Sequence, residues 1–183
     1  MKTEADKIDH ARENAAGWAE TIAEHVKCME CDRDRLDELR EELGVMDAEL
    51  PNAENADTPE GIAAIEAHHE WTRENGEELA ELIAASKING EELDEEEARD
   101  LAIESALSVR IFGERIDGKW EADRFEILLT WGGPALRIVG ELDKHMQARS
   151  AQIEYRDWGT PWTRFHAIEH DTLLKWVNCF CFE

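Results

Sequence analysis

The sequence predicts an α+β protein in which a long N-terminal helix and further acidic helices precede a four-stranded antiparallel sheet, with a C-terminal helix packed on that sheet. Three observations predict this order. Apolar residues recur at helical spacing through the first hundred residues. The spacing then changes to the alternation that is typical of strands, interrupted by Gly-containing turns. An apolar run, TLLKWVNCFCF, occupies residues 172–182 and predicts the covering helix.

Residues 1–50 predict one long helix with a heptad seam. One row of the seam contains Ala15, Ile22, Met29, Leu36 and Leu43, and the other contains Trp18, His25, Asp32 and Leu39. Such a seam is typical of a coiled coil or a helical hairpin, so a homodimer through this helix is one expectation. His25 and Asp32 interrupt the seam beside Cys28 and Cys31.

Residues 51–105 predict a highly acidic helical segment after a Pro- and Asn-containing linker. Thr58 and Pro59 form a good N-cap and first-turn pair, so a helix should begin there. Asn75-Gly76 should end it, and a third helix should continue to Lys87 before Asn89-Gly90. Asp94 with Glu97 is a capping box and predicts the start of a fourth helix.

Residues 106–183 predict the sheet and the C-terminal helix. Strands are expected near 107–111 and at 125–131, 135–142 and 151–155, with turns at Asp117-Gly118 and at Gly132-Gly133-Pro134. Consecutive strands with short turns predict an antiparallel meander, and such a sheet needs a cover on one face.

The strongest feature of the composition is its charge. The chain has 44 acidic and 20 basic side chains, a formal net charge of −24. Residues 51–105 hold 17 acidic and 3 basic side chains, whereas residues 106–183 hold 12 and 10. This balance disfavours direct binding of nucleic acid or of an anionic membrane, and it favours a basic protein or nucleoprotein complex as partner. Without a signal sequence, a long apolar segment or a disulfide framework, the chain is expected to be cytoplasmic.

The carboxylates of the acidic segment are the predicted partner-binding residues. On a helix, side chains three or four residues apart lie about 5–6 Å from one another, so Glu66, Glu70 and Glu74 should form a row. Duplex DNA presents a phosphate about every 3.4 Å of axis on each strand, and a carboxylate row on a rigid helix can imitate such a track. Acidic helices also serve only as solvated faces, which is the alternative interpretation. The predicted set is Glu66, Glu70, Glu74, Glu77, Glu78, Glu81, Glu91, Glu92, Asp94, Glu95, Glu96, Glu97 and Asp100.

Two patterns could bind zinc, although neither is expected to. Cys28 and Cys31 have CxxC spacing, and Cys179 and Cys181 could complete a tetrahedral site; buried cysteine more often behaves as a small apolar residue. His166, Glu169 and His170 match HxxEH, the inverted zinc-protease pattern, but only 13 residues follow it. Dinucleotide, P-loop, hydrolase-elbow and HExxH signatures are absent, so we expect no cofactor, no metal, no catalytic residues and no enzyme activity.

Three stretches carry a resemblance to a known group. FEILLTWGGPALRIVGEL (125–142), IEYRDWGTPWT (153–163) and the helical stretch over 13–43 resemble small acidic proteins of unknown function encoded by bacteriophages and prophages. The resemblance implies an accessory role in phage or mobile-element biology inside a bacterial host cell. Together with the charge, it leads to a DNA mimic that inhibits a CRISPR–Cas or restriction complex. The alternatives are a coiled-coil oligomeric adaptor and, third, a zinc-dependent enzyme at His166 and His170.

Overall fold

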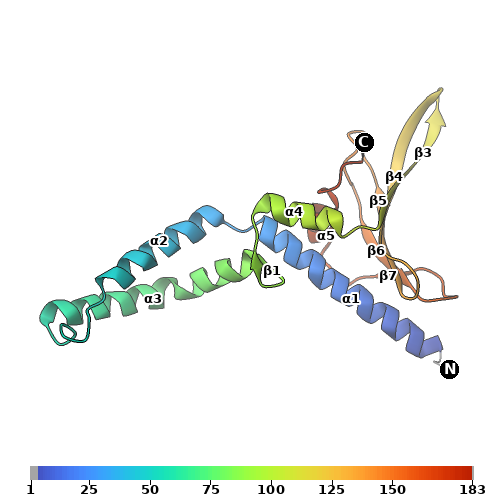
Figure 1. Cartoon of the computed structure of the whole chain (residues 1–183). Helices are drawn as coiled ribbons and strands as arrows, with labels where there is room; N and C mark the ends of the chain where they lie inside the picture. Colours follow the sequence, from blue (N-terminus) through green and yellow to red (C-terminus); the bar gives the residue numbers. More distant parts are fainter. Residues whose placement is uncertain (1–3, 183) are drawn as a thin grey trace. The chain divides into compact units, whose positions relative to one another are not determined.

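The computed structural model describes residues 4–182, without the side chains of residues 4–9 and of Ile116 (Figure 1). The chain divides into two compact units. The sheet unit contains the chain up to Met29 and again from Glu95 onward, and the hairpin unit contains Glu30–Asp94.

The sheet unit combines three helices with a five-stranded sheet. Its elements are α1 (Glu4–Met29), α4 (Glu95–Glu104), β3 (Ser108–Ile116), β4 (Lys119–Thr130), β5 (Ala135–Glu141), β6 (Gln152–Arg156), β7 (Thr163–Phe165) and α5 (His170–Val177). The α+β class is therefore confirmed, and the capping box at Asp94 does precede a helix that begins at Glu95.

The sheet is an antiparallel meander with the strand order β3-β4-β5-β6-β7. The prediction of four strands is wrong, because β7 adds a fifth at the edge, where Thr163 pairs with Tyr155 and Phe165 with Ile153. A three-residue strand is too short to show alternation in a sequence. The Asp117-Gly118 turn is confirmed: both residues have positive φ, as a type I′ hairpin turn requires.

One face of the sheet packs against α1 and α5, and this layer forms the main core. Ala15, Ile22 and Val26 of α1 are buried there with Phe125 of β4 and Trp176 of α5. The seam predicted from the heptad spacing is therefore real, but it packs against the protein's own sheet. The C-terminal helix also packs as predicted, although it ends at Val177; beyond it, the Phe182 ring lies 4.8 Å from the Phe125 ring.

The structure divides the predicted helix over residues 1–50 in two, which corrects that prediction. Helix α1 ends at Met29, and α2 (Arg33–Glu49) begins a new helix. Asp32 is the N-cap of α2, and its carboxylate accepts a hydrogen bond of 3.0 Å from the Arg35 backbone N–H. Asp32 thus interrupts the seam because it is the residue at which α2 starts. Its short side chain can accept a hydrogen bond from a backbone N–H of the first helical turn, which is why Asp is favoured at this position.

The hairpin unit consists of α2, α3 (Pro59–Ala85) and a two-stranded ribbon of β1 (Lys87–Ile88) and β2 (Glu91–Glu92). Thr58 caps α3 as predicted, with its hydroxyl accepting from the Gly61 N–H at 3.1 Å and Pro59 in the first turn. The predicted break at Asn75-Gly76 is wrong. Leu79, just beyond it, is buried against α2, and this packing outweighs the weak helix propensity of one glycine.

His25 explains the second interruption of the seam. It is only 3% exposed, and its Nδ1 accepts a hydrogen bond of 3.2 Å from the Trp176 indole N–H. The ring is therefore neutral with its proton on Nε2, and burial lowers the pKa of His25 below 6.5. The buried pair fills a position where a heptad seam would otherwise hold an apolar side chain.

The lowered pKa of His25 should make the stability of the fold depend on pH. Below pH 6.5 the unfolded chain binds a proton at His25 that the folded chain excludes, so the free energy of unfolding should fall as the pH drops from about 6.5 toward the lowered folded pKa. The slope contributed by this group is at most about 1.4 kcal/mol per pH unit. Urea denaturation at pH 7.5 and 5.5 measures it. His25→Gln should lose this contribution and the exposed His166→Gln should keep it; equal pH dependence in both variants would contradict the assignment.

Candidate interaction surface

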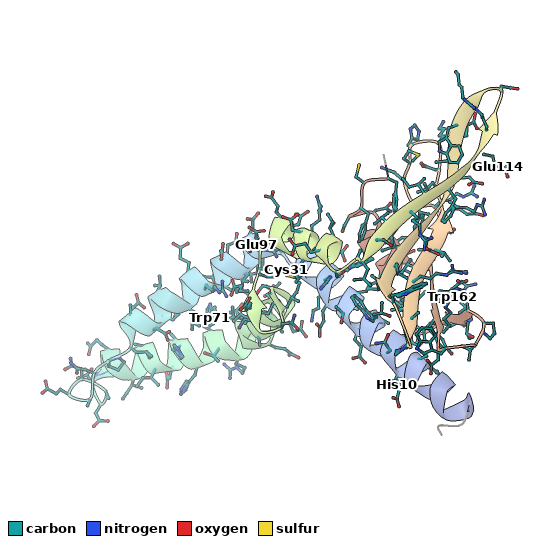
Figure 2. All side chains as sticks on the ribbon, turned by 45° about the vertical axis from the view of Figure 1, so that its right-hand side comes forward. His10, Cys31, Trp71, Glu97, Glu114 and Trp162 are labelled. Carbon is teal, nitrogen blue, oxygen red and sulfur yellow. The ribbon has the colours of Figure 1, made fainter. Side chains whose placement is uncertain are left out.

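Helices α2 and α3 form an antiparallel hairpin around a small apolar core of their own. Leu36 and Leu39 of α2 are buried with Leu79 of α3, and Trp71 and Leu43 pack against them. Figure 2 shows Trp71 on the hairpin, where its indole N–H donates to the Glu42 carboxylate at 2.9 Å. The inward faces of both helices are thus used for packing, so their polar faces point away from the hairpin core.

Five glutamates form a continuous row on the outward side of α3. We call this set the α3 carboxylate stripe: Glu66, Glu70, Glu74, Glu77 and Glu81. All five are exposed, and their spacing of three or four residues keeps them on the side opposite Leu79. At 1.5 Å per residue, the stripe is about 22 Å long. Glu70 lies 3.7 Å from Arg73, an exposed pair that neutralises little charge.

Two of the predicted contact residues are instead bound by arginines of the hairpin itself. Glu78 receives two hydrogen bonds of 3.1 Å from Arg35, and Glu92 receives bonds of 2.8 and 2.7 Å from Arg40. These guanidinium groups lower the pKa of both carboxyl groups, because they stabilise the charged form. Glu78 and Glu92 therefore hold the hairpin together and are less suited to a partner.

The remaining predicted residues lie on other elements than the stripe. Glu91 is exposed on the β1–β2 ribbon, and Asp94 precedes α4. Glu95, Glu96, Glu97 and Asp100 are exposed on α4, which belongs to the sheet unit. In the first turn of α4, the three glutamates also favour the positive end of the helix dipole. Part of the predicted set thus has a local structural role.

The outward side of α2 carries further acidic side chains of the hairpin unit. Asp34, Asp37, Glu38 and Glu41 are exposed there. In total the hairpin unit, Glu30–Asp94, contains 21 acidic and 5 basic side chains, a formal net charge of −16. Two-thirds of the net negative charge of the chain therefore lies on this unit.

The structure does not bring together the residues of the two patterns that could bind zinc. Among the described residues, no group of three or more His, Cys, Asp or Glu side chains is placed to hold a metal ion. Cys179 Sγ lies 3.5 Å from the sulfur of Met29, and burial raises the pKa of the Cys179 thiol, which opposes formation of a metal-binding thiolate. His166 precedes α5, which begins only at His170, so the HxxEH pattern lacks the helical turn that would align its histidines.

The uncovered face of the sheet carries a charge network that the sequence interpretation missed. Arg137 binds Glu126 at 2.7 Å and Glu154 at 2.6 Å, and Arg110 lies 2.6 Å from the other oxygen of Glu126. Trp162, labelled in Figure 2, covers the Arg137 guanidinium at 4.1 Å. The sequence did contain a signal for this network. The charged residues of RFE (124–126), LRI (136–138) and IEYR (153–156) occupy alternate strand positions, and alternate positions on a strand point to the same face of the sheet.

No protein-family model, curated protein or solved structure matches the chain. Within residues 4–182, no helix is both long and apolar enough to cross a membrane. The function is therefore inferred from the residues and their arrangement.

Proposed function

We propose that this chain is a binding protein that presents the acidic hairpin to a basic partner, and that it inhibits a nucleic-acid-binding defence complex, of CRISPR–Cas or restriction type, by occupying the DNA site. The α3 carboxylate stripe is the centre of the contact. The sheet unit carries the hairpin and takes no part in this contact.

The density of charge along the hairpin is the observation that supports this proposal. The 27 residues of α3 extend about 40 Å. A net charge of −16 over that length is about one negative charge per 2.5 Å of axis. Duplex DNA has about one per 1.7 Å. A cationic cleft that binds DNA would thus meet a comparable field on a rigid support.

The stripe is also ready to bind without rearrangement. Its five carboxylates are exposed, and Arg35 and Arg40, which pair with Glu78 and Glu92, form no ion pair with these five among the described residues. These pairs leave the stripe charged, and they join α2 to α3 through Glu78 and to the β1–β2 ribbon through Glu92. Preformed geometry lowers the entropic cost of association.

Neutralising the stripe should weaken binding and its salt dependence. The variant carries Glu→Gln at all five stripe positions. At roughly 0.2–1 kcal/mol for each exposed pair, it should lose about 1–5 kcal/mol of binding free energy. The assay is displacement of fluorescent duplex DNA from a panel of purified restriction endonucleases and CRISPR effector complexes, at two salt concentrations.

The matched control removes the same charge from the sheet unit, with Glu→Gln at Glu20, Glu24, Glu104, Glu114 and Glu121, which are all exposed. It should displace DNA as the unmodified chain does. The proposal fails if no complex in the panel releases its DNA, or if both five-site variants lose activity equally, because a nonspecific effect of net charge would then explain the result.

A further inference from the structure

Strand β3 forms one edge of the five-stranded sheet, and its outer side is unpaired. Within residues 4–182, β4 is the only strand that pairs with it. An edge strand presents a row of free N–H and C=O groups that can pair with another strand. Proteins often protect such an edge with proline or lysine, but the sequence of β3, SVRIFGERI, contains neither. The strand is therefore open to a further strand.

The C-terminal part of β3 also lacks support from the rest of the sheet. The pairing of β4 with β5 begins at Arg124, so residues 113–116 and 119–122 form a two-stranded ribbon beyond the other strands (Figure 1). Two strands alone are only marginally stable in water, and a third strand is needed for a stable sheet. A strand added to the outer side of β3 would supply it.

Exposed apolar side chains lie close together along this edge. Leu107, Val109 and Phe112 are 62%, 39% and 41% exposed. Single exposed apolar side chains are common on proteins, whereas a group of them indicates an interaction surface. The edge thus combines unpaired backbone groups with apolar side chains that a partner strand could cover.

The sequence of β3 is complementary to itself when two copies pair antiparallel about Phe112. In that register Phe112 lies opposite the partner's Phe112, and Arg110 lies opposite the partner's Glu114, twice in the pair. Directly opposite side chains share a face of the sheet with Cβ atoms about 4.5–5.5 Å apart, where aromatic pairs and opposite charges stabilise the pairing. Registers centred on Ile111 or Gly113 give no pair of opposite charges.

Within one chain, Glu114 lies opposite another glutamate. Its neighbour in the register of β3 with β4 is Glu121, and both side chains are exposed (Figure 2 labels Glu114). Like charges at directly opposite positions destabilise a sheet. Arg110 lies 2.6 Å from Glu126 on β4, and a guanidinium has enough N–H donors to serve a second carboxylate from the other side. A second copy would therefore bring an arginine to Glu114.

We propose that two copies of this chain pair through their β3 strands, antiparallel and centred on Phe112, and form a symmetric dimer with one continuous sheet. Residues 113–116 of each copy then pair with the partner's residues 108–111, so each copy supports the ribbon of the other. Such an interface uses the same surface of both copies and closes at two. Strand β3 has two basic and one acidic side chain, so the contact itself is not acidic. The inference is independent of the function proposed for the hairpin.

Sedimentation velocity of the full chain at physiological salt tests the proposal. The unmodified chain should form a dimer with a Kd below about 100 µM. Glu114→Arg places an arginine opposite the partner's Arg110 and should weaken the dimer about 10-fold or more. Glu121→Arg is the matched control. It removes the same contact between two glutamates within the chain, but it lies on β4 and should leave the Kd unchanged.

Phe112→Glu and Trp120→Glu form a second matched pair. Both aromatic side chains are exposed, and each lies opposite an arginine of its own chain, Arg124 and Arg115, so both variants should fold, which circular dichroism checks. Phe112→Glu brings two carboxylates together at the symmetry axis and should abolish the dimer, whereas Trp120→Glu should keep it. Two results overturn the proposal. One is an unmodified chain that stays monomeric up to about 500 µM. The other is that Glu114→Arg and Phe112→Glu dimerise as tightly as their controls, because the interface would then lie elsewhere.

Discussion

Replacing Ile22 by Asp is expected to unfold the sheet unit. Ile22 is fully buried between α1 and the sheet, so the variant loses an apolar side chain and places a carboxylate where no partner exists among the described core residues. The expected loss is more than about 4 kcal/mol. Near-ultraviolet circular dichroism follows it directly, because six of the seven tryptophans belong to the sheet unit.

Ile103→Asp is the matched control for this experiment. Ile103 is on α4 of the same unit and is 39% exposed, so the same substitution should cost much less there. A coiled-coil adaptor predicts another outcome, namely that Ile22→Asp converts a dimer into folded monomers. Sedimentation of a folded, dissociated variant would therefore support the adaptor and contradict the packing described for α1.

Replacing Arg137 by Met should have the second largest effect. Its guanidinium neutralises Glu126, which is 6% exposed, and Glu154 beside it. Removing one member of a buried pair costs roughly 3–5 kcal/mol, and we expect about 2–4 kcal/mol here because Arg137 and Glu154 keep some contact with water. Urea denaturation at pH 7 gives the difference.

A second substitution separates charge from packing. In Arg137→Met, Arg110 is the one arginine left beside the buried Glu126 carboxylate; the double variant Arg137→Met and Glu126→Gln removes that charge, so part of the lost stability should return. Arg115→Met, at an exposed position, should be nearly neutral. If the double variant is less stable than Arg137→Met, then Arg110 alone is sufficient to stabilise the Glu126 carboxylate, and the role assigned to Arg137 on this face is wrong.

Local signals in the sequence were sufficient for helix starts and turns. Thr58 caps α3 from within one helical turn, and Asp94 directly precedes α4, so both helix starts can be predicted without knowledge of the fold. The break before α2 shows the limit of periodicity. The heptad pattern passes through Asp32 without a phase change, yet its two halves pack in different units.

The candidate surface was also predictable only in part, because some of its contacts join residues that are far apart in the sequence. The α3 carboxylate stripe follows from spacing within one helix. The pairs Arg35–Glu78 and Arg40–Glu92 join residues that are 43 and 52 positions apart, and only the packing of α2 against α3 and the return of the chain in the β1–β2 ribbon bring them together. The position of β3 at the edge of the sheet likewise depends on the order of the five strands.

The chain leaves the sheet unit after Met29 and returns at Glu95, and Arg33 donates a 2.7 Å hydrogen bond to the Leu93 carbonyl where the two ends of the excursion meet. The hairpin is consequently an insertion whose two ends are held together by this hydrogen bond. The loop between α2 and α3 lies at its other end, where a change of length leaves the base unaltered. Paired insertions of one helical turn in α2 and α3 would lengthen it by about 5.4 Å each without altering any strand. The length of the acidic hairpin can thus be changed, by evolution or by design, while the rest of the chain keeps its sequence.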